Sequence, residues 1–142
     1  MRNIPILLAA VGALHAAPTF AQATAFDGGW NVVMSCTPHV GEDDDGDAKG
    51  YKQEFSATVV QGRLEGTYGT KDQPGWHFLR GDIKPDGSAA LRLDGIVDNP
   101  KYAIKDAPRG KPYSYRVKAR FEGNSGSGER MTGRACAFTF SR

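Results

Sequence analysis

An acidic run in the first half of the chain holds the residues most able to bind a cation. Asp43, Asp45 and Asp47 have the spacing of a calcium-binding loop, and Glu54 stands at the last position of a twelve-residue loop that starts at Asp43. Such a loop needs glycine where Ala48 stands, and it needs flanking helices where this sequence predicts strands. We expect a solvated acidic loop, with a cation site at Asp43, Asp45 and Asp47 as the alternative.

The other reactive side chains form no catalytic motif. Neither His39 nor His77 has a Cys, His or carboxylate neighbour at metal-ligand spacing, and we expect both at the surface or rim. Ser125 is not in a Gly-x-Ser-x-Gly elbow, and the glycine run 123–128 leads into a predicted strand, unlike a phosphate loop. We therefore predict no catalytic residue, no cofactor and a protein that is not an enzyme.

The first 23 residues have the features of a secretory signal peptide. Arg2 is followed by an apolar run over 4–17, and a small-x-small cleavage site ends at Ala23. An uncleaved membrane anchor is the alternative, but the run is short for a span of about 20 residues. We expect residues 24–142 to form the mature protein, a single domain that is periplasmic or secreted and has no membrane span after cleavage.

Cys36 and Cys136 are the only two cysteines. Export favours a structural disulfide between them over a thiol nucleophile or a metal ligand. If the first and last strands are antiparallel neighbours, the register that opposes Cys36 to Cys136 also opposes Trp30 to Arg142. The inward positions would then be apolar on both strands. This register predicts a barrel closed by its terminal strands.

Period-two hydrophobic patterns and glycine-containing turns predict an all-β fold. Apolar residues alternate with polar ones over 30–36, 51–59, 88–97 and 113–121. Shorter strands are expected over 64–68, 76–83 and 134–142, and Gly66 indicates close packing or a bend. The proline-rich segment 98–112 is expected to be a loop folded over one end, and 123–128 a glycine-rich turn. We predict an antiparallel up-and-down barrel of seven or eight strands.

The two ends of the chain resemble calycin-type barrels, the lipocalins, avidins and their relatives. Gly28-Gly29-Trp30 matches the Gly-x-Trp element of their first strand, and Arg142 could place the family's basic residue on that indole, with Arg134 as a substitute. The resemblance implies a barrel closed by Trp30 and Arg142. The avidins' biotin-binding residues are absent. Phe-Asp-Gly-x-Trp at the start and Gly-Arg-x-Cys near the end also resemble exported bacterial proteins with no assigned function.

The charge and the aromatic residues of the chain limit its possible functions. The net charge of +2 argues against a dedicated nucleic-acid binder, although the first half is acidic and the second basic. One strand face could bind a polyanion such as lipopolysaccharide, or could simply be solvated; its residues are Arg92, Arg116, Lys118 and Arg120. Aromatic residues could fill the barrel or line a ligand site; the candidates are Tyr68, Trp76, Phe78, Tyr113 and Tyr115.

Two functions follow as hypotheses. The first is a non-enzymatic barrel that binds a small apolar or aromatic ligand at its open end, with 98–112 as a lid. The alternative is a protein-binding module, such as a periplasmic protease inhibitor or an envelope-associated partner, which would insert a loop or the segment 24–27 into another protein. The sequence indicates neither the ligand, the partner nor the oligomeric state.

Overall fold

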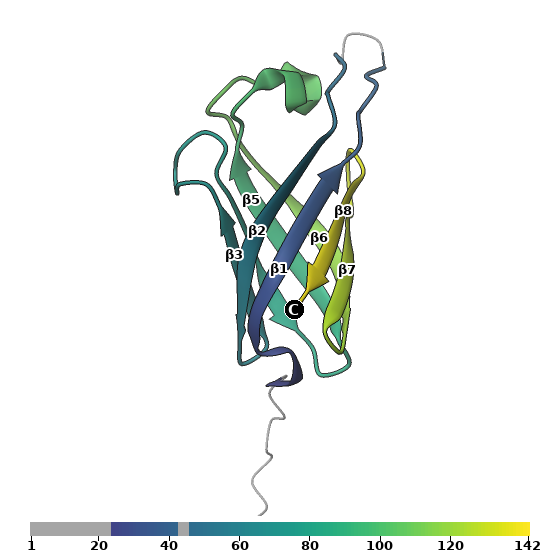
Figure 1. Cartoon of the computed structure of the whole chain (residues 1–142). Helices are drawn as coiled ribbons and strands as arrows, with labels where there is room; N and C mark the ends of the chain where they lie inside the picture. The colour runs from purple at the N-terminus through teal and green to yellow at the C-terminus, as the bar shows by residue number, and fades with distance from the viewer. Residues whose placement is uncertain (1–23, 43–45) are drawn as a thin grey trace, which may run out of the picture.

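A computed structural model describes residues 24–42 and 46–142; the predicted signal peptide lies outside this range. Eight antiparallel strands follow one another around a closed barrel, so the predicted up-and-down architecture is confirmed (Figure 1). The strands are β1 (Gly28–Cys36), β2 (Tyr51–Val60), β3 (Arg63–Tyr68), β4 (His77–Ile83), β5 (Ser88–Ile96), β6 (Pro112–Glu122), β7 (Ser125–Arg130) and β8 (Cys136–Ser141). Three short 3-10 turns accompany them: η1 (Thr24–Phe26), η2 (Pro100–Tyr102) and η3 (Ile104–Asp106). No helix in the described ranges is long and apolar enough to cross a membrane.

The terminal strands close the barrel in the predicted register. β1 pairs with β8 from Asn31 opposite Ser141 to Cys36 opposite Cys136, and the two cysteines form a disulfide. The bond links positions 100 residues apart. In the chain-entropy model, a loop of that size stabilises the fold by roughly 4 to 5 kcal/mol. The disulfide therefore links the two strands whose pairing closes the longest stretch of chain and restricts its conformational freedom most.

Trp30 and Arg142 meet at the other end of this seam. The guanidinium carbon of Arg142 lies 4.6 Å from the centre of the Trp30 ring, whereas Arg134 is at the opposite end of β8. Arg142 also donates hydrogen bonds to the carbonyl oxygens of Ala25 and Asp27, at 2.9 and 2.7 Å. The basic residue expected on the indole is therefore Arg142, and it also holds the chain that enters β1.

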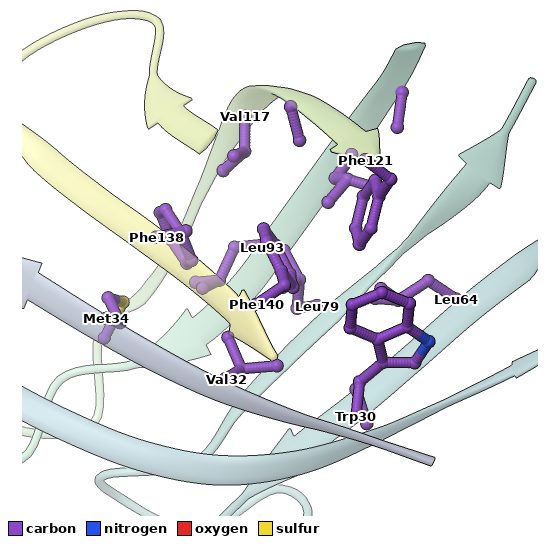
Figure 2. Packing of buried hydrophobic residues seen from close by; sticks show 14 of the residues in the cluster. Trp30, Val32, Met34, Leu64, Leu79, Leu93, Val117, Phe121, Phe138 and Phe140 are labelled. Atoms are coloured by element: carbon purple, nitrogen blue, oxygen red, sulfur yellow. The ribbon is translucent and has the colours of Figure 1, made fainter. Parts of the chain in front are cut away.

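The barrel is filled at the end where η1 and the C-terminus lie. The Trp30 indole donates a hydrogen bond to the Phe26 carbonyl oxygen at 2.8 Å and meets the Phe121 ring edge-on, with centroids 5.3 Å apart. Figure 2 shows further inward side chains from several strands gathered beside them. The residues labelled there are Trp30, Val32, Met34, Leu64, Leu79, Leu93, Val117, Phe121, Phe138 and Phe140. All ten are buried, as alternation predicts for the inward face of a strand.

The interpretation of 123–128 as a turn was wrong over most of its length. Only Gly123 and Asn124 turn, and β7 starts at Ser125. Gly126 lies under the Phe121 ring, whose Cδ1 would come within 2.9 Å of an added Cβ. Gly128 is similarly close to Ala119 and Val117 of β6. These glycines therefore make room for large side chains of the neighbouring strand, and they do not mark a turn.

Candidate functional site

The end of the barrel where β1 finishes is hollow. Segments 37–50, 69–76, 97–111 and 131–135 connect the strands there, and η2 and η3 lie at this end of the barrel (Figure 1). A cavity of about 540 Å³ lies at this end, lined by the ends of the strands and by residues of the segments 69–76, 97–111 and 131–135. Its principal side chains are aromatic or polar: Tyr51, Lys52, Gln53, Tyr68, His77, Asp98, Tyr102, Lys111, Tyr113, Arg130 and Arg134. Since the opposite end is packed, one barrel combines a solid base with an open cavity.

Tyr113 is held in the cavity wall by a glycine on the next strand. Gly95 of β5 is directly opposite Tyr113 of β6, and a Cβ on Gly95 would collide with the phenol ring. The ring therefore occupies the space that the missing side chain leaves. Burial raises the pKa of Tyr113 above its ordinary value of 10.0, so the phenol keeps its proton at neutral pH and can donate a hydrogen bond.

His77 is part of the interior, and the prediction of a surface or rim position was wrong for it. The residue is 1% exposed, and its ring stacks on Tyr68 with centroids 5.0 Å apart and meets Phe55 edge-on at 4.9 Å. It is in phase with the buried Leu79, which places it inward. Burial lowers the pKa of His77 from 6.5 to about 4, so the imidazole is neutral at pH 7. His39, in contrast, is half-buried in segment 37–50, at the rim.

Arg134 braces the open end. Its Nη1 donates a hydrogen bond to the Tyr102 carbonyl oxygen at 2.6 Å, and its Nη2 donates to those of Thr37 and Lys49, at 2.6 and 2.8 Å. These three acceptors belong to two different loops, and the guanidinium comes from a third. The residue is 4% exposed, and its guanidinium carbon is 5.3 Å from the centre of the Tyr51 ring. Arg134 therefore fixes the relative positions of the loops around the cavity.

A second arginine enters the cavity from the end of β7. The guanidinium carbon of Arg130 lies 4.1 Å from the centre of the Tyr115 ring, and its Nε donates a hydrogen bond to the Thr132 carbonyl oxygen at 2.6 Å. Within the described ranges, neither Arg130 nor Arg134 has a carboxylate at ion-pair distance. In the part of the chain that the structure describes, both positive charges are therefore balanced by carbonyl oxygens and aromatic rings alone.

Three buried polar atoms of the lining residues have no hydrogen-bond partner in the described part of the chain. They are Gln53 Oε1, His77 Nε2 and Arg134 Nε. A buried polar group without a partner costs about 1 to 3 kcal/mol. Such groups are usually paired in native proteins, so these three are available to a bound molecule or to water.

The aromatic residues predicted to bind a ligand separate into three positions. Tyr68 and Tyr113 line the cavity. Tyr115 is 5% exposed and lies deeper, where its hydroxyl donates to Met34 Sδ at 3.4 Å. Trp76 and Phe78 stack on each other at 6.4 Å and do not line the cavity, because Phe78 has the opposite strand phase to His77.

The proline-rich segment predicted to cover one end of the barrel contributes much of the cavity wall. Ile96 and Val97 lead into it, and η2 and η3 lie within it. The residues of this segment at the cavity are Asp98, Asn99, Tyr102, Ala103, Ile104, Ala107, Lys111 and Pro112. The Tyr102 carbonyl holds this segment to Arg134, so the wall is fixed at that point.

The predicted basic face lies on the outer wall, away from the cavity. Arg92 of β5 is directly opposite both Arg80 of β4 and Arg116 of β6, which makes a row of three arginines across adjacent strands. Asp94 pairs with Arg80 and Arg92, at 3.3 and 3.0 Å. Lys118 and Arg120 continue along β6 and are exposed. Binding of a polyanion by Arg92, Arg116, Lys118 and Arg120 stays a prediction.

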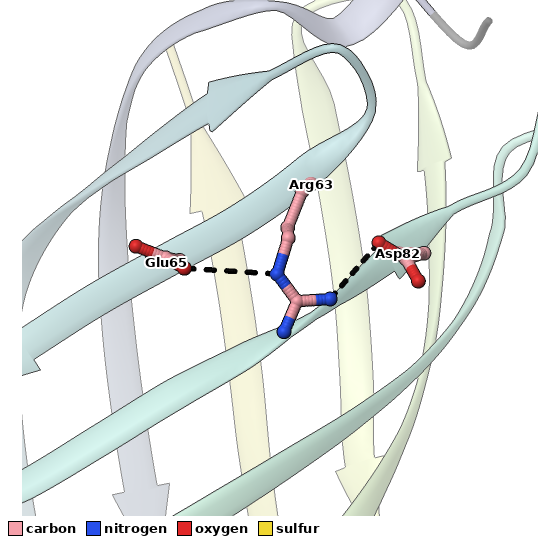
Figure 3. A network of polar contacts seen from close by, with 3 residues as sticks. All are labelled: Arg63, Glu65 and Asp82. Atoms are coloured by element: carbon pink, nitrogen blue, oxygen red, sulfur yellow. Dashed lines mark hydrogen bonds and ion pairs between the residues drawn. The ribbon is translucent and has the colours of Figure 1, made fainter.

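The same outer wall also carries compensating acids. Arg63 lies between Glu65 and Asp82, at 3.6 and 3.1 Å, on the neighbouring strands β3 and β4 (Figure 3). All three side chains are about half or more exposed. Exposed pairs of this kind contribute little to stability, typically below 1 kcal/mol. They keep this part of the barrel solvated and nearly neutral.

The acidic loop provides no metal site in the part of the chain that the structure describes. Asp43 and Asp45 lie outside the described residues. Asp47 accepts a hydrogen bond from the Gly41 backbone N–H at 3.2 Å, which closes the loop on itself. No group of three His, Cys, Asp or Glu able to hold a metal ion occurs among the described residues.

Several cavity residues were not singled out from the sequence, although two had a visible signal. Gln53 and His77 each occupy an inward position of a strand whose other inward residues are apolar. A polar residue at an inward strand position marks the level along the barrel axis where the apolar core ends. Tyr51 is in phase with the inward residues of β2, so alternation predicts that it faces inward but not that it is a site residue. Arg130 and Arg134 carried no such signal, because they lie at the end of β7 and in the loop before β8.

No family model, no curated protein and no solved structure matches this chain. The class of protein is defined by its own geometry: a closed, eight-stranded, up-and-down β-barrel with its terminal strands joined by a disulfide. This architecture is compatible with a calycin-like fold. Within this class, the chain is distinguished by an aromatic and cationic cavity at the disulfide end.

Proposed function

We propose that this protein is an exported, calycin-like barrel that binds a small aromatic ligand in the cavity at its open end and performs no catalysis. The single observation that carries the proposal is the contrast between a packed end and a hollow end in one barrel. The cavity volume of about 540 Å³ is within the range of roughly 300 to 1,000 Å³ that is usual for small-molecule sites.

The chemistry of the wall favours an aromatic ligand. The rings of Tyr51, Tyr68, His77 and Tyr113 surround the cavity, and aromatic rings pack favourably in stacked or edge-on arrangements. Gln53 and His77 add polar atoms without partners, which supply specificity when a ligand satisfies them. Small eight-stranded barrels hold one small ligand when their interior is not filled.

The cavity wall is also largely preformed, so a ligand would have to order few loops or side chains when it binds. Arg134 ties the loops together, and the 97–111 segment packs over the cavity in η2 and η3. A preformed wall lowers the entropic cost of binding, because fewer side chains and loops must be immobilised. We assign to the 98–112 segment the role of a fixed cover with openings beside it.

The alternative, insertion of the segment 24–27 into a protein partner, has less support. Phe26 is 7% exposed and packs on Phe121 with ring centroids 5.9 Å apart. The Asp27 carboxylate accepts hydrogen bonds from the backbone N–H groups of Gln61 and Gly62, at 2.8 and 3.0 Å. Insertion into a partner would require these contacts to break.

Native mass spectrometry of protein released from the bacterial periplasm tests the proposal. We expect a chain that starts at Thr24 and carries a bound small molecule. Ala103→Trp, on the cavity wall, should remove that adduct, while Ala137→Trp, on the exposed face of β8, should keep it. A ligand-free mass together with no thermal shift across a panel of aromatic metabolites would argue against a binding function. Retention of the full signal sequence would argue against export.

A further inference from the structure

We infer that the ligand of this cavity is an aromatic acid, with a planar body between the tyrosine rings and one carboxylate or sulfonate held by Arg130 and Arg134. This inference rests on the proposed function and adds the charge of the ligand to it. It follows from the cavity's charge, from the way its arginines are held and from the protonation of its phenols.

The charge of the wall is strongly positive. Four basic residues line the cavity, Lys52, Lys111, Arg130 and Arg134, against one acid, Asp98. That acid already has a cationic neighbour, since its Oδ1 is 3.5 Å from Arg109 Nη2. His77 is neutral at pH 7 and adds no charge. The cavity therefore attracts anions and repels ammonium groups.

The two arginines are placed where an anion would gain most. Arg134 cannot turn to solvent, because three carbonyl oxygens hold its Nη atoms, and its buried Nε still lacks a partner. Arg130 uses its Nε on Thr132, and within the described ranges its two Nη atoms have no hydrogen-bond partner. A buried positive charge without a counter-ion is unfavourable, and an anionic group in the cavity would compensate both guanidinium groups.

The phenols complete the recognition of an acid. Burial raises the pKa of both Tyr51 and Tyr113, so both hydroxyls remain protonated and can donate to an oxyanion. Tyr68 stacks on the buried His77 ring and lines the cavity, so its own ring offers a flat aromatic surface. Donors and cations near the mouth with aromatic planes beside them match a molecule that has an aromatic body and one acidic end.

Two fluorescent probes that differ by one acidic group test the inference. 1-Anilinonaphthalene-8-sulfonate and N-phenyl-1-naphthylamine share the same aromatic body, and only the first carries a sulfonate. We expect the sulfonate to bind the wild-type protein about tenfold or more tightly than the neutral probe, which is the range for a charged hydrogen bond. Ala103→Trp should weaken both probes, which locates them in the cavity.

Variants of Arg130 separate charge from structure. Arg130→Gln should reduce the preference for the sulfonate severalfold, with Arg134 still present, and change the affinity of the neutral probe less than twofold, while Arg130→Lys should keep most of the preference. Lys118→Gln, on the outer face of β6, removes the same charge away from the cavity and should change neither affinity. Each variant is first compared with wild type by its melting temperature, and the Lys variant keeps the test valid if the Gln variant unfolds.

The outcomes distinguish this inference from the proposed function. Equal affinity of the two probes, or a preference that Arg130→Gln leaves undiminished, would overturn the acid assignment and leave ligand binding intact. Failure of both probes to bind the wild-type cavity would overturn both. Binding of the sulfonate that Ala103→Trp does not affect would place it on another surface and would also overturn the assignment.

Discussion

The guanidinium of Arg142 lies over the indole of Trp30, with 4.6 Å between the guanidinium carbon and the ring centre. The contact joins the first strand to the residue that follows the last strand. Arg142 also binds the carbonyl oxygens of Ala25 and Asp27 and the Asn124 side chain, at 2.9, 2.7 and 3.1 Å. The Arg142 side chain therefore contacts four residues at the closed end of the barrel: Trp30, Ala25, Asp27 and Asn124.

Loss of that side chain should destabilise the barrel. We expect Arg142→Ala to lower the free energy of unfolding by about 1 to 2 kcal/mol, because it removes an exposed cation–π contact and three hydrogen bonds. Arg142→Lys should lose less, since it keeps the charge over the ring. Urea denaturation measures both, and Arg120→Ala, an exposed arginine on β6, is the control. A loss no greater than that of Arg120→Ala would show that the contact is not stabilising.

The disulfide at the opposite end of the seam should contribute more. Cys36→Ser, Cys136→Ser and the double variant should each lower the melting temperature by a similar amount, roughly 15 °C, if the entropic estimate of 4 to 5 kcal/mol holds. Reduction of the wild-type protein should give the same decrease, since all four changes open the same bond. Free thiols in the oxidised protein, or clearly unequal single variants, would contradict the pairing.

The closed half of the barrel could be predicted from the sequence because its constraints are periodic. Trp30, Val32 and Met34 occupy alternate positions on one face of their strand, and the match of Cys36 with Cys136 left one register for the seam. Alternation of this kind specifies which face of each strand is buried. The strand β7 was missed because its inward positions are Gly126 and Gly128, which carry no hydrophobic signal.

The open half could be predicted only in part, because much of its wall comes from loops, where no hydrophobic period exists. Arg134 acts through backbone carbonyl oxygens of two distant loops, and any residue type could have supplied those oxygens. The aromatic candidates were selected by residue type alone, so Phe78 was grouped with Tyr68 although it faces outward. The polar inward positions Gln53 and His77 were the available signal for where the core ends.

The fit between Gly95 and Tyr113 gives a stability test for the cavity wall. Gly95→Ala places a methyl group against the phenol ring and should cost about 1 to 3 kcal/mol, as overpacking usually does. In a Tyr113→Leu background the same change should cost less, because the ring that it meets is gone. Gly29→Ala is the matched control, since a Cβ there has no atom within 4 Å. Equal costs in the two backgrounds would contradict the close contact.

The buried imidazole of His77 gives a pH dependence with a definite sign. Burial holds the pKa of folded His77 at about 4, against 6.5 in the unfolded chain. Between these values the unfolded chain binds a proton that the folded chain does not, so the free energy of unfolding falls as the pH decreases from 6.5 to about 4. Above pH 6.5 this contribution is complete and constant.

Replacement of His77 isolates this contribution from that of the carboxylates. Between pH 7 and 4.5 the wild-type protein should lose about 2 to 3 kcal/mol more stability than His77→Phe, which keeps a ring stacked on Tyr68. His39→Gln is the control, because it removes a half-buried histidine at the rim. Urea denaturation at a series of pH values measures all three. Equal pH dependence of the free energy of unfolding in wild type and His77→Phe would contradict this account. It would mean that His77 accepts a proton as readily in the folded barrel as in the unfolded chain, because water reaches the imidazole at this end of the barrel.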